Sequence, residues 1–188
     1  MKQTYSFFII LLFTYFGTTG QSTIKVDGSA TGLNNGTSWV DAFRNINDAI
    51  LVAQAGDTIW VASGVYRPTN DGNRDSSFVL KNKVGLYGGF AGSETALSQR
   101  NWNLNQTILS GDIGLPNDNT DNSYNVVFGI GLDTTTAIDG FIIEKGAADD
   151  TNPAEENLRR KQGGGMNLRP LSATDCKPII RHCIFRNN

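Results

Sequence analysis

Short apolar runs, separated by Gly, Asn and Asp, dominate the chain after residue 21. In the segment 57–64, strict alternation places Ile59 and Val61 on one face of a strand and Trp60 on the other. Similar runs recur to the end of the chain, and each is closed by residues that favour a tight bend. The pattern predicts many short β-strands.

One segment has helical spacing instead. Its apolar residues recur at intervals of three and four, as on one stripe of an amphipathic helix. They are Trp39, Phe43, Ile46, Ile50 and Ala53. Gly56 supplies a stop signal after this stripe. We therefore predict a short N-terminal capping helix over about residues 38–54, covering the open edge of the first strands.

The chain also repeats itself at an offset of 42 residues. Residues 137–146 align with residues 179–188, with a bend at Gly140 in the first segment and at His182 in the second. Two strands joined by a bend at the same phase are typical of one coil of a solenoid, so we predict an all-β solenoid with rungs over residues 57–188. The coinciding positions are Ile138 with Ile180, Phe141 with Cys183, Ile143 with Phe185 and Gly146 with Asn188.

The first 20 residues are organised like a signal peptide. Lys2 precedes the unbroken apolar run 7–13, and small residues follow up to Gly20. A membrane-spanning helix is the alternative, but it requires about twenty apolar residues, and this apolar core has about ten. We predict cleavage after Gly20 and export, which leaves residues 21–188 as one domain with no transmembrane helix.

The charge and cysteine content bear on nucleic-acid binding and on disulfide bonding. Without Lys2, 15 lysine and arginine residues (16 − 1) face 18 aspartate and glutamate residues, so we predict no nucleic-acid partner. Cys176 and Cys183 lie in one predicted extended segment, whose length separates them by up to roughly 20 Å. We expect two free thiols, with Cys183 buried; a disulfide requires the chain to bend back.

Several short motifs then follow one another in a defined order. They are Ile24-Lys-Val-Asp27, Asn34-Asn-Gly-Thr-Ser-Trp39, Ala55-Gly-Asp-Thr-Ile-Trp-Val-Ala62, Leu86-Tyr-Gly-Gly-Phe90, Ile108-Leu-Ser-Gly-Asp112, Gly163-Gly-Gly-Met166 and Phe185-Arg-Asn-Asn188. Over residues 23–188 the chain resembles the N-terminal part of secreted right-handed parallel β-helix proteins of the pectate-lyase-like superfamily. The resemblance is greatest to Bacteroidetes-type surface proteins with repeats similar to those of chlamydial polymorphic outer membrane proteins.

The resemblance implies a right-handed parallel β-helix, export and a cell-surface or adhesive role. The repeats of these proteins carry a GGxx half and an FxxN half, and this chain has one complete pair. No C-terminal sorting region follows, so we expect the chain to stop part-way through a repeat. The matching residues are Gly163, Gly164, Gly165, Phe185 and Asn188.

An acidic turn is the first candidate site. Asp112, Asp118 and Asp121 are crowded together with side-chain amides, and hard cations such as calcium prefer this ligand chemistry. Their spacing matches no EF-hand and no glycine-rich calcium repeat. The alternative is a structural turn, because Asp and Asn side chains cap their own backbone. The three aspartates are therefore calcium candidates only.

Basic side chains are the second candidate site, because lyases of the superfamily use an arginine or lysine to remove a proton beside a calcium-bound uronate. The repeat alignment offers another explanation, since Arg181 falls on Asp139 and Arg186 on Glu144, which pairs opposite charges on adjacent strands. No carboxylate cluster accompanies these bases, so we predict no catalytic residue. His182, the single histidine, is predicted to be a bend residue. The outward bases are Lys81, Lys83, Arg181 and Arg186.

A loop insertion over about residues 147–174 separates the two aligned coils. Such insertions form binding surfaces on one flank of a solenoid, although a solvated, disordered insertion is the alternative. Trp60, Tyr66 and Tyr87, predicted to point outward, offer faces for stacking on sugar rings. We predict a secreted, adhesin-like scaffold, extracellular or on the outer membrane surface, that binds a polysaccharide or cell-surface glycan. The alternative is a carbohydrate-active enzyme, a polysaccharide lyase or glycoside hydrolase, whose active site lies on rungs beyond Asn188.

Overall fold

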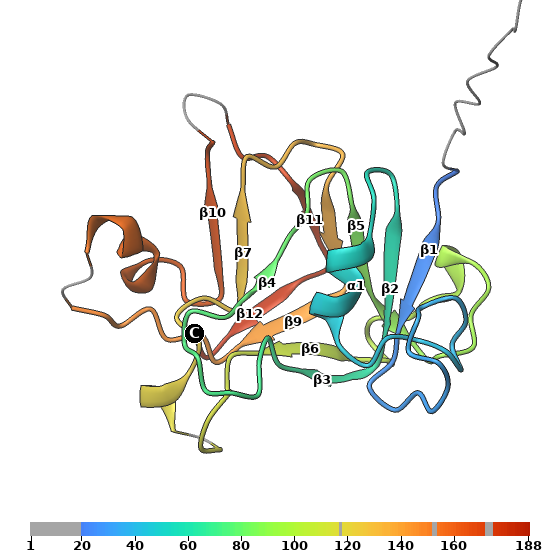
Figure 1. Ribbon diagram of the computed structural model, residues 1–188, viewed down its shortest axis with the longest axis horizontal. Coiled ribbons are helices and arrows are strands. Elements are labelled where there is room, and N and C mark those ends of the chain that lie inside the picture. Colours follow the sequence, from blue (N-terminus) through green and yellow to red (C-terminus); the bar gives the residue numbers. More distant parts are fainter. Residues whose placement is uncertain (1–19, 117, 152–153, 172–174) are drawn as a thin grey trace, which may run out of the picture.

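The computed structural model describes residues 20–116, 118–151, 154–171 and 175–188, so all of the predicted signal peptide except Gly20 lies outside the described residues. The strands form three sheets, and every strand pair is parallel (Figure 1). Sheet A has the order β1 (Thr23–Val26), β2 (Thr58–Ala62), β5 (Gly85–Phe90), β8 (Ala137–Asp139) and β11 (Ile179–Arg181). Sheet B has the order β3 (Gly64–Tyr66), β6 (Thr107–Ser110), β9 (Phe141–Glu144) and β12 (Ile184–Arg186). Sheet C has the order β4 (Phe78–Val79), β7 (Val127–Ile130) and β10 (Met166–Arg169).

From β2 onward the chain visits sheets A, B and C in turn, and we call each such passage a coil. The first coil is β2, β3 and β4, the second β5, β6 and β7, and the third β8, β9 and β10, while β11 and β12 begin a fourth. Strand β1 precedes them and pairs with β2, so the pairing begins earlier than the predicted first rung. The prediction of a β-rich chain of parallel strands with few helices is confirmed.

The 42-residue offset is the observed register between the third and fourth coils. Ile138 pairs with Ile180, and Ile143 pairs with Phe185. The bends coincide too, because Gly140 and His182 both have positive φ angles, of 85° and 47°. Left-handed backbone is inexpensive for glycine and costs other residues about 1–2 kcal/mol, so stacking must hold His182 in place.

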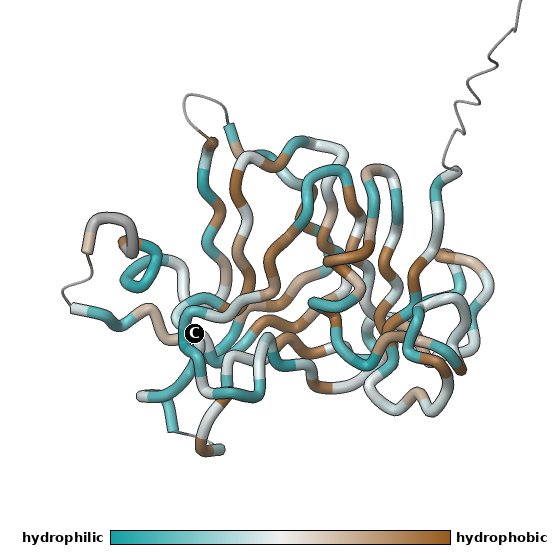
Figure 2. The backbone as a smooth tube through the Cα atoms, viewed as in Figure 1, coloured by the Kyte–Doolittle hydropathy of each residue, from teal (hydrophilic) through white to brown (hydrophobic). Residues whose placement is uncertain are grey.

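The apolar core lies between the three sheets. Inward ladders run from coil to coil, as in the buried series Tyr66 in β3, Leu109 in β6 and Ile143 in β9. Figure 2 shows hydrophobic positions concentrated along the strands, with largely hydrophilic loops around them. Each fully buried aliphatic or aromatic side chain contributes about 1.5–3 kcal/mol, so burial of the core side chains together is the main source of stability.

The capping helix is shorter than predicted. Helix α1 spans Ile46–Val52, and its N-cap is Asn45, whose side chain accepts a hydrogen bond from the N–H of Asn47 at 2.8 Å. The preceding residues are not helical, because Phe43 forms a parallel bridge with Val26. The apolar spacing from Trp39 onward therefore covers both the bridge at Phe43 and helix α1. Ile46 and Ala49 are buried, and the helix packs against β1, β2 and β4.

Two aromatic side chains predicted to be outward are buried. Tyr66 is 6% exposed and belongs to the core, because Gly64, with φ of 148°, turns the chain from sheet A to sheet B and shifts the alternation. Trp60 does project outward from sheet A, but the Phe90 ring covers it, with ring centroids 4.8 Å apart. Neither ring is available to a sugar.

The predicted insertion over 147–174 is also too long. Strand β10 lies inside it and pairs with β7, so the excursion between β9 and β10 ends before Met166. It contains the short 3₁₀ helix η3 (Glu155–Lys161); two further 3₁₀ helices in the described part of the chain are η1 (Leu97–Gln99) and η2 (Asn119–Asp121). None of the helices among the described residues has the length and apolar character needed to cross a membrane.

Burial of Tyr66 predicts a change in stability at alkaline pH. Its hydroxyl donates to the carbonyl of Ala62 at 3.1 Å, and burial raises the pKa of Tyr66 to about 12 from 10.0. Because the folded pKa is the higher one, the neutral phenol's contribution is complete below pH 10 and is lost as the pH rises towards 12. Urea unfolding from pH 9 to 12 should show wild type losing up to about 2–3 kcal/mol relative to Tyr66→Phe. Parallel pH profiles for the two proteins would contradict this burial.

Candidate functional site

The three aspartates of the acidic turn have separate roles. Asp112 is buried and forms an ion pair with Lys145 (Nζ to Oδ2, 2.5 Å). Asp118 accepts hydrogen bonds from the N–H and hydroxyl of Thr120, and Asp121 accepts one from the N–H of Leu115 at 2.7 Å. Among the described residues, no three His, Cys, Asp or Glu side chains form a group suited to a metal. The predicted three-carboxylate calcium set is therefore not brought together.

The two halves of the repeat motif, in contrast, are in contact. Asn188 donates from Nδ2 to the carbonyl of Ile143 and accepts from the N–H of Gly146, both at 3.0 Å, so it bridges to the coil before it. A Cβ atom on Gly165 would lie 2.8 Å from Nδ2 of Asn188 and 3.1 Å from the Phe185 ring. Gly165 is thus required because the FxxN side chains fill its space. Gly163 is needed in the same turn for another reason, because its φ angle of 66° lies in the left-handed region that favours glycine.

Of the two predicted pairs of opposite charges on adjacent strands, one forms an ion pair. Arg186 Nε lies 2.6 Å from Oε2 of Glu144, as the alignment predicted. Arg181 is in register with Asp139, but the Asp139 carboxylate is bound by Arg100 and His182 instead. Of the other outward bases, Lys81 donates to the carbonyl of Leu51, and Lys83 is a bend residue with φ of 64°.

Arg100 and His182 belong to a polar and aromatic cluster that the sequence did not reveal. We call it the corner cluster, because it lies where the chain turns from sheet A to sheet B. In sheet A, Tyr87 and Asp139 occupy paired outward positions. Arg100 and Trp102 come from the loop after η1, and His182 is the bend residue between β11 and β12. The cluster consists of Tyr87, Arg100, Trp102, Asp139 and His182.

Asp139 is the anchor of the corner cluster. Its Oδ2 lies 2.8 Å from Nη2 of Arg100, and its Oδ1 lies 2.8 Å from Nδ1 of His182. The Arg100 and Asp139 side chains are 7% and 9% exposed, so loss of either partner would leave a buried charge. Arg100 also donates from Nη1 to the carbonyls of Gly88 and Asp139, both at 3.1 Å. The guanidinium is therefore held from several sides.

Trp102 is fixed by the groups that Asp139 anchors. The Trp102 and His182 rings stack with centroids 4.0 Å apart, and the Arg100 guanidinium carbon lies 5.0 Å from the Trp102 ring centre. Arg100 also lies 5.3 Å from the Tyr87 ring centre, and each such cation–π contact contributes about 0.5–1 kcal/mol or more. These contacts restrict the motion of the Trp102 ring.

Two hollows adjoin Trp102. A shallow, open hollow of about 620 Å³ is lined by Leu97, Ser98, Arg100 and Trp102. A small hollow of about 70 Å³ is lined by Trp102 and His182 with parts of β9 and its surroundings. Trp102 is half-buried and borders both hollows, so part of its indole remains accessible to a ligand.

The corner cluster was missed because its decisive residues lie outside the strands. Arg100 and Trp102 occur in the polar run 100–106, where neither periodicity nor repeat alignment applies. A signal was present, however, since Trp102 is a tryptophan within a run of Asn and Gln, where no core position explains it. His182, predicted to be only a bend residue, is both a bend residue and a member of the cluster.

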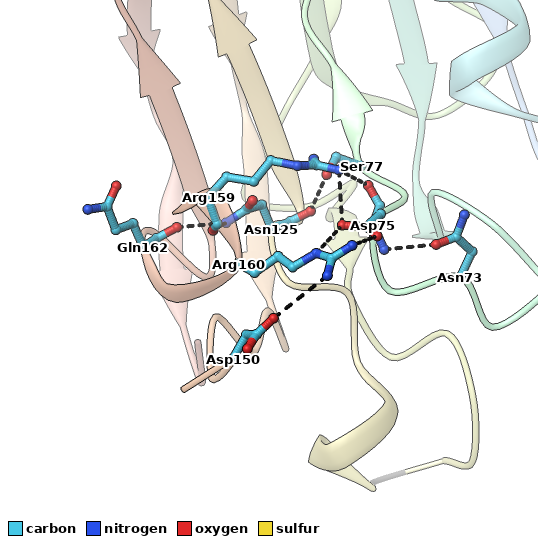
Figure 3. A network of polar contacts seen from close by, with 8 residues as sticks. All are labelled: Asn73, Asp75, Ser77, Asn125, Asp150, Arg159, Arg160 and Gln162. Carbon is cyan, nitrogen blue, oxygen red and sulfur yellow. Dashed lines mark hydrogen bonds and ion pairs between the residues drawn. The ribbon is translucent and has the colours of Figure 1, made fainter. Parts of the chain in front are cut away.

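The opposite flank carries the excursion between β9 and β10, and ion pairs bind it to the first coil (Figure 3). Arg160 forms two hydrogen bonds with the Asp75 carboxylate, at 2.9 and 2.6 Å, and Arg159 donates to the carbonyl of Asp75 at 2.7 Å. The Nδ2 group of Asn125 donates to the excursion as well, and its two protons are shared among the carbonyl oxygens of Arg159, Gln162 and Gly163. The described part of the excursion is therefore anchored.

A polar groove of about 880 Å³ runs beside this excursion. No aromatic residue is among those that line it in the described part of the chain, so it offers hydrogen bonds and charge but no stacking surface. The side chains that line it include Asn119, Thr120, Asn122, Lys145, Asp149, Lys161, Asn187 and Asn188. We call it the flank groove.

Both cysteines are free, as predicted. Cys183 is partly buried against the core rather than fully buried. Burial raises the pKa of its thiol, which favours the protonated and unreactive form. Nothing in these contacts indicates a catalytic cysteine.

No family model, curated protein or solved structure matches the chain. The resemblance carried by the motifs therefore stays a prediction, and the corner cluster and flank groove must be interpreted from their own geometry.

The contact between the two halves of the repeat motif predicts that one added methyl group at Gly165 lowers the stability of the fold. Gly165→Ala places its Cβ against Asn188 and Phe185, and overpacking of this kind costs about 1–3 kcal/mol. Gly28→Ala is the matched control, because its Cβ would meet Tyr66 at an ordinary 3.7 Å. Chemical denaturation should show a loss of stability for Gly165→Ala only. Equal stability of the two variants would show that the GGxx glycine is not packed against the FxxN residues.

Proposed function

We propose that this protein is a secreted right-handed parallel β-helix of the pectate-lyase-like superfamily, with repeats similar to those of chlamydial polymorphic outer membrane proteins. The three parallel sheets, visited in turn, support this proposal. Handedness follows from a general rule, because a connection between parallel strands of one sheet is right-handed in about 98% of cases. Contact between Gly165 and the FxxN residues gives the motif the physical basis that such repeats require.

We further propose that the scaffold is adhesin-like and binds a cell-surface glycan or polysaccharide at the corner cluster. The observation that carries this is the rigid, half-buried Trp102 beside an open hollow. A sugar ring presents an apolar C–H face that suits an indole, and hydroxyls that suit nearby polar groups. Ser98 and Arg100 line the same hollow and supply such groups.

Preorganisation also favours binding at this position. Asp139 holds Arg100 and His182 on the indole before any ligand arrives, so little conformational entropy is lost when a sugar binds. The outward aromatics predicted from the strands contribute less, since Trp60 and Tyr66 are buried and only Tyr87 is half-exposed. Export, proposed from the first 20 residues, places the cluster where surface glycans occur.

Replacement of Trp102 tests the glycan proposal. Trp102→Ala should weaken the best ligand of a glycan panel at least tenfold, about 1.4 kcal/mol, because a buried tryptophan contact is a typical hot spot. Titration calorimetry with that ligand measures the effect. Leu104→Ala is the control, since Leu104 lies in the same loop and is 79% exposed.

Two outcomes would reject this assignment. Unchanged affinity in Trp102→Ala would move glycan binding away from the corner cluster. Release of unsaturated or hydrolysed products from polygalacturonate or alginate by the wild-type protein would replace the binding scaffold with the alternative, a carbohydrate-active enzyme.

A further inference from the structure

The segment 121–125, at the entry to β7, holds four buried side-chain oxygens that have no hydrogen-bond partner among the described residues. They are Oδ1 of Asp121, Oδ1 of Asn122, Oγ of Ser123 and Oδ1 of Asn125. Asn122 is 2% exposed, and Ser123 and Asn125 are fully buried. An unsatisfied buried polar group costs about 1–3 kcal/mol, so four in five residues call for a bound partner.

The segment cannot easily turn these oxygens out to water, because three coils hold it. The N–H of Ser123 donates to the carbonyl of Gly111 in the second coil, and its carbonyl accepts from Ala147 in the third. Arg74, in the first coil, donates from Nε to the carbonyl of Asn122 at 2.7 Å. The oxygens are thus fixed before a ligand binds.

The chemistry of these atoms selects the ligand. Asp121 Oδ1 carries negative charge, while its Oδ2 is already used by the N–H of Leu115. The Asn122 amide donates to Asn119 through Nδ2, which leaves its carbonyl oxygen as an acceptor. Carboxylate, amide carbonyl and hydroxyl oxygens are the ligands of hard cations, whereas an anion would be repelled. Asn122 also lines the flank groove, which provides a path for an ion.

We propose that Asp121 and Asn122, with Ser123 beside them, bind a calcium ion. This ligand set differs from the one predicted from sequence, because Asp112 pairs with Lys145 and Asp118 caps Thr120. A site with one carboxylate binds weakly, in the range of about 10⁻⁴–10⁻³ M that is typical of extracellular calcium modules. The inference is independent of glycan binding at the corner cluster.

Thermal melting of chelator-treated protein tests the site. Addition of 10 mM calcium chloride, on the order of ten times the expected Kd or more, stabilises the bound state by about 1.4 kcal/mol or more and should raise Tm by at least about 3–6 °C. Asp121→Asn should abolish the rise, and this isosteric change keeps an acceptor for the N–H of Leu115. Asp118→Asn is the matched control and should retain the full rise, because Asp118 only caps its own turn.

Terbium luminescence gives a second measurement that does not depend on stability. Terbium, a calcium substitute, should show tyrosine-sensitised emission that calcium displaces and that Asp121→Asn, but not Asp118→Asn, lowers. The proposal is overturned if calcium produces no Tm rise beyond that of sodium chloride at equal ionic strength, which would mean that water satisfies the oxygens. It is equally overturned if Asp121→Asn retains the rise and the emission.

Discussion

In-register parallel pairing of successive coils is the interaction on which the rest of this structure depends. Each coil places its apolar residues directly above those of the coil before, as Ile143 lies over Leu109 and Phe185 over Ile143. The pairing holds only if the chain turns at the same position each time, and left-handed residues at matching bends achieve this. Lys145 and Asn187, with φ of 61° and 54°, repeat the arrangement at the end of sheet B. A strand shifted by one residue along its whole length would turn its inward side chains towards solvent. The pairing of β2 with β5 does shift by one residue between Trp60 and Ala62, but only at the end of the paired stretch.

The corner cluster and the flank groove both result from this stacking. Because outward positions also lie in register, Asp139 is placed beside Tyr87, and a loop that leaves the second coil can bring Arg100 to both. The buried ion pair contributes little net free energy, since desolvation offsets its Coulomb attraction. Its effect is to fix the loop, so that contacts with Arg100 and His182 hold the Trp102 ring in one position in the corner cluster. On the other flank, Asp75 and its arginine partners fix the excursion that borders the flank groove.

The parts of this structure that the sequence predicted are those with a local or repeated signal. The register of the last two coils was predictable because residues 137–146 and 179–188 have equal length and no insertion. The helix was extended too far because the apolar spacing continued through Phe43, which bridges to β1 instead. Contacts such as that of Arg100 with Asp139 join residues 39 apart through an irregular loop, and no periodicity encodes them. The same limit applies to Asn122, whose burial depends on three coils at once.

The most direct test of this account is the pairing of the coils in solution. Nuclear Overhauser spectroscopy of the isotope-labelled protein should detect backbone contacts of the parallel type between Leu109 and Ile143, and between Ile143 and Phe185. Their presence would establish that the coils stack in the register described, with the corner cluster and the segment 121–125 positioned by it. Antiparallel contacts, or parallel contacts at an offset other than 42 residues between the last two coils, would contradict the account.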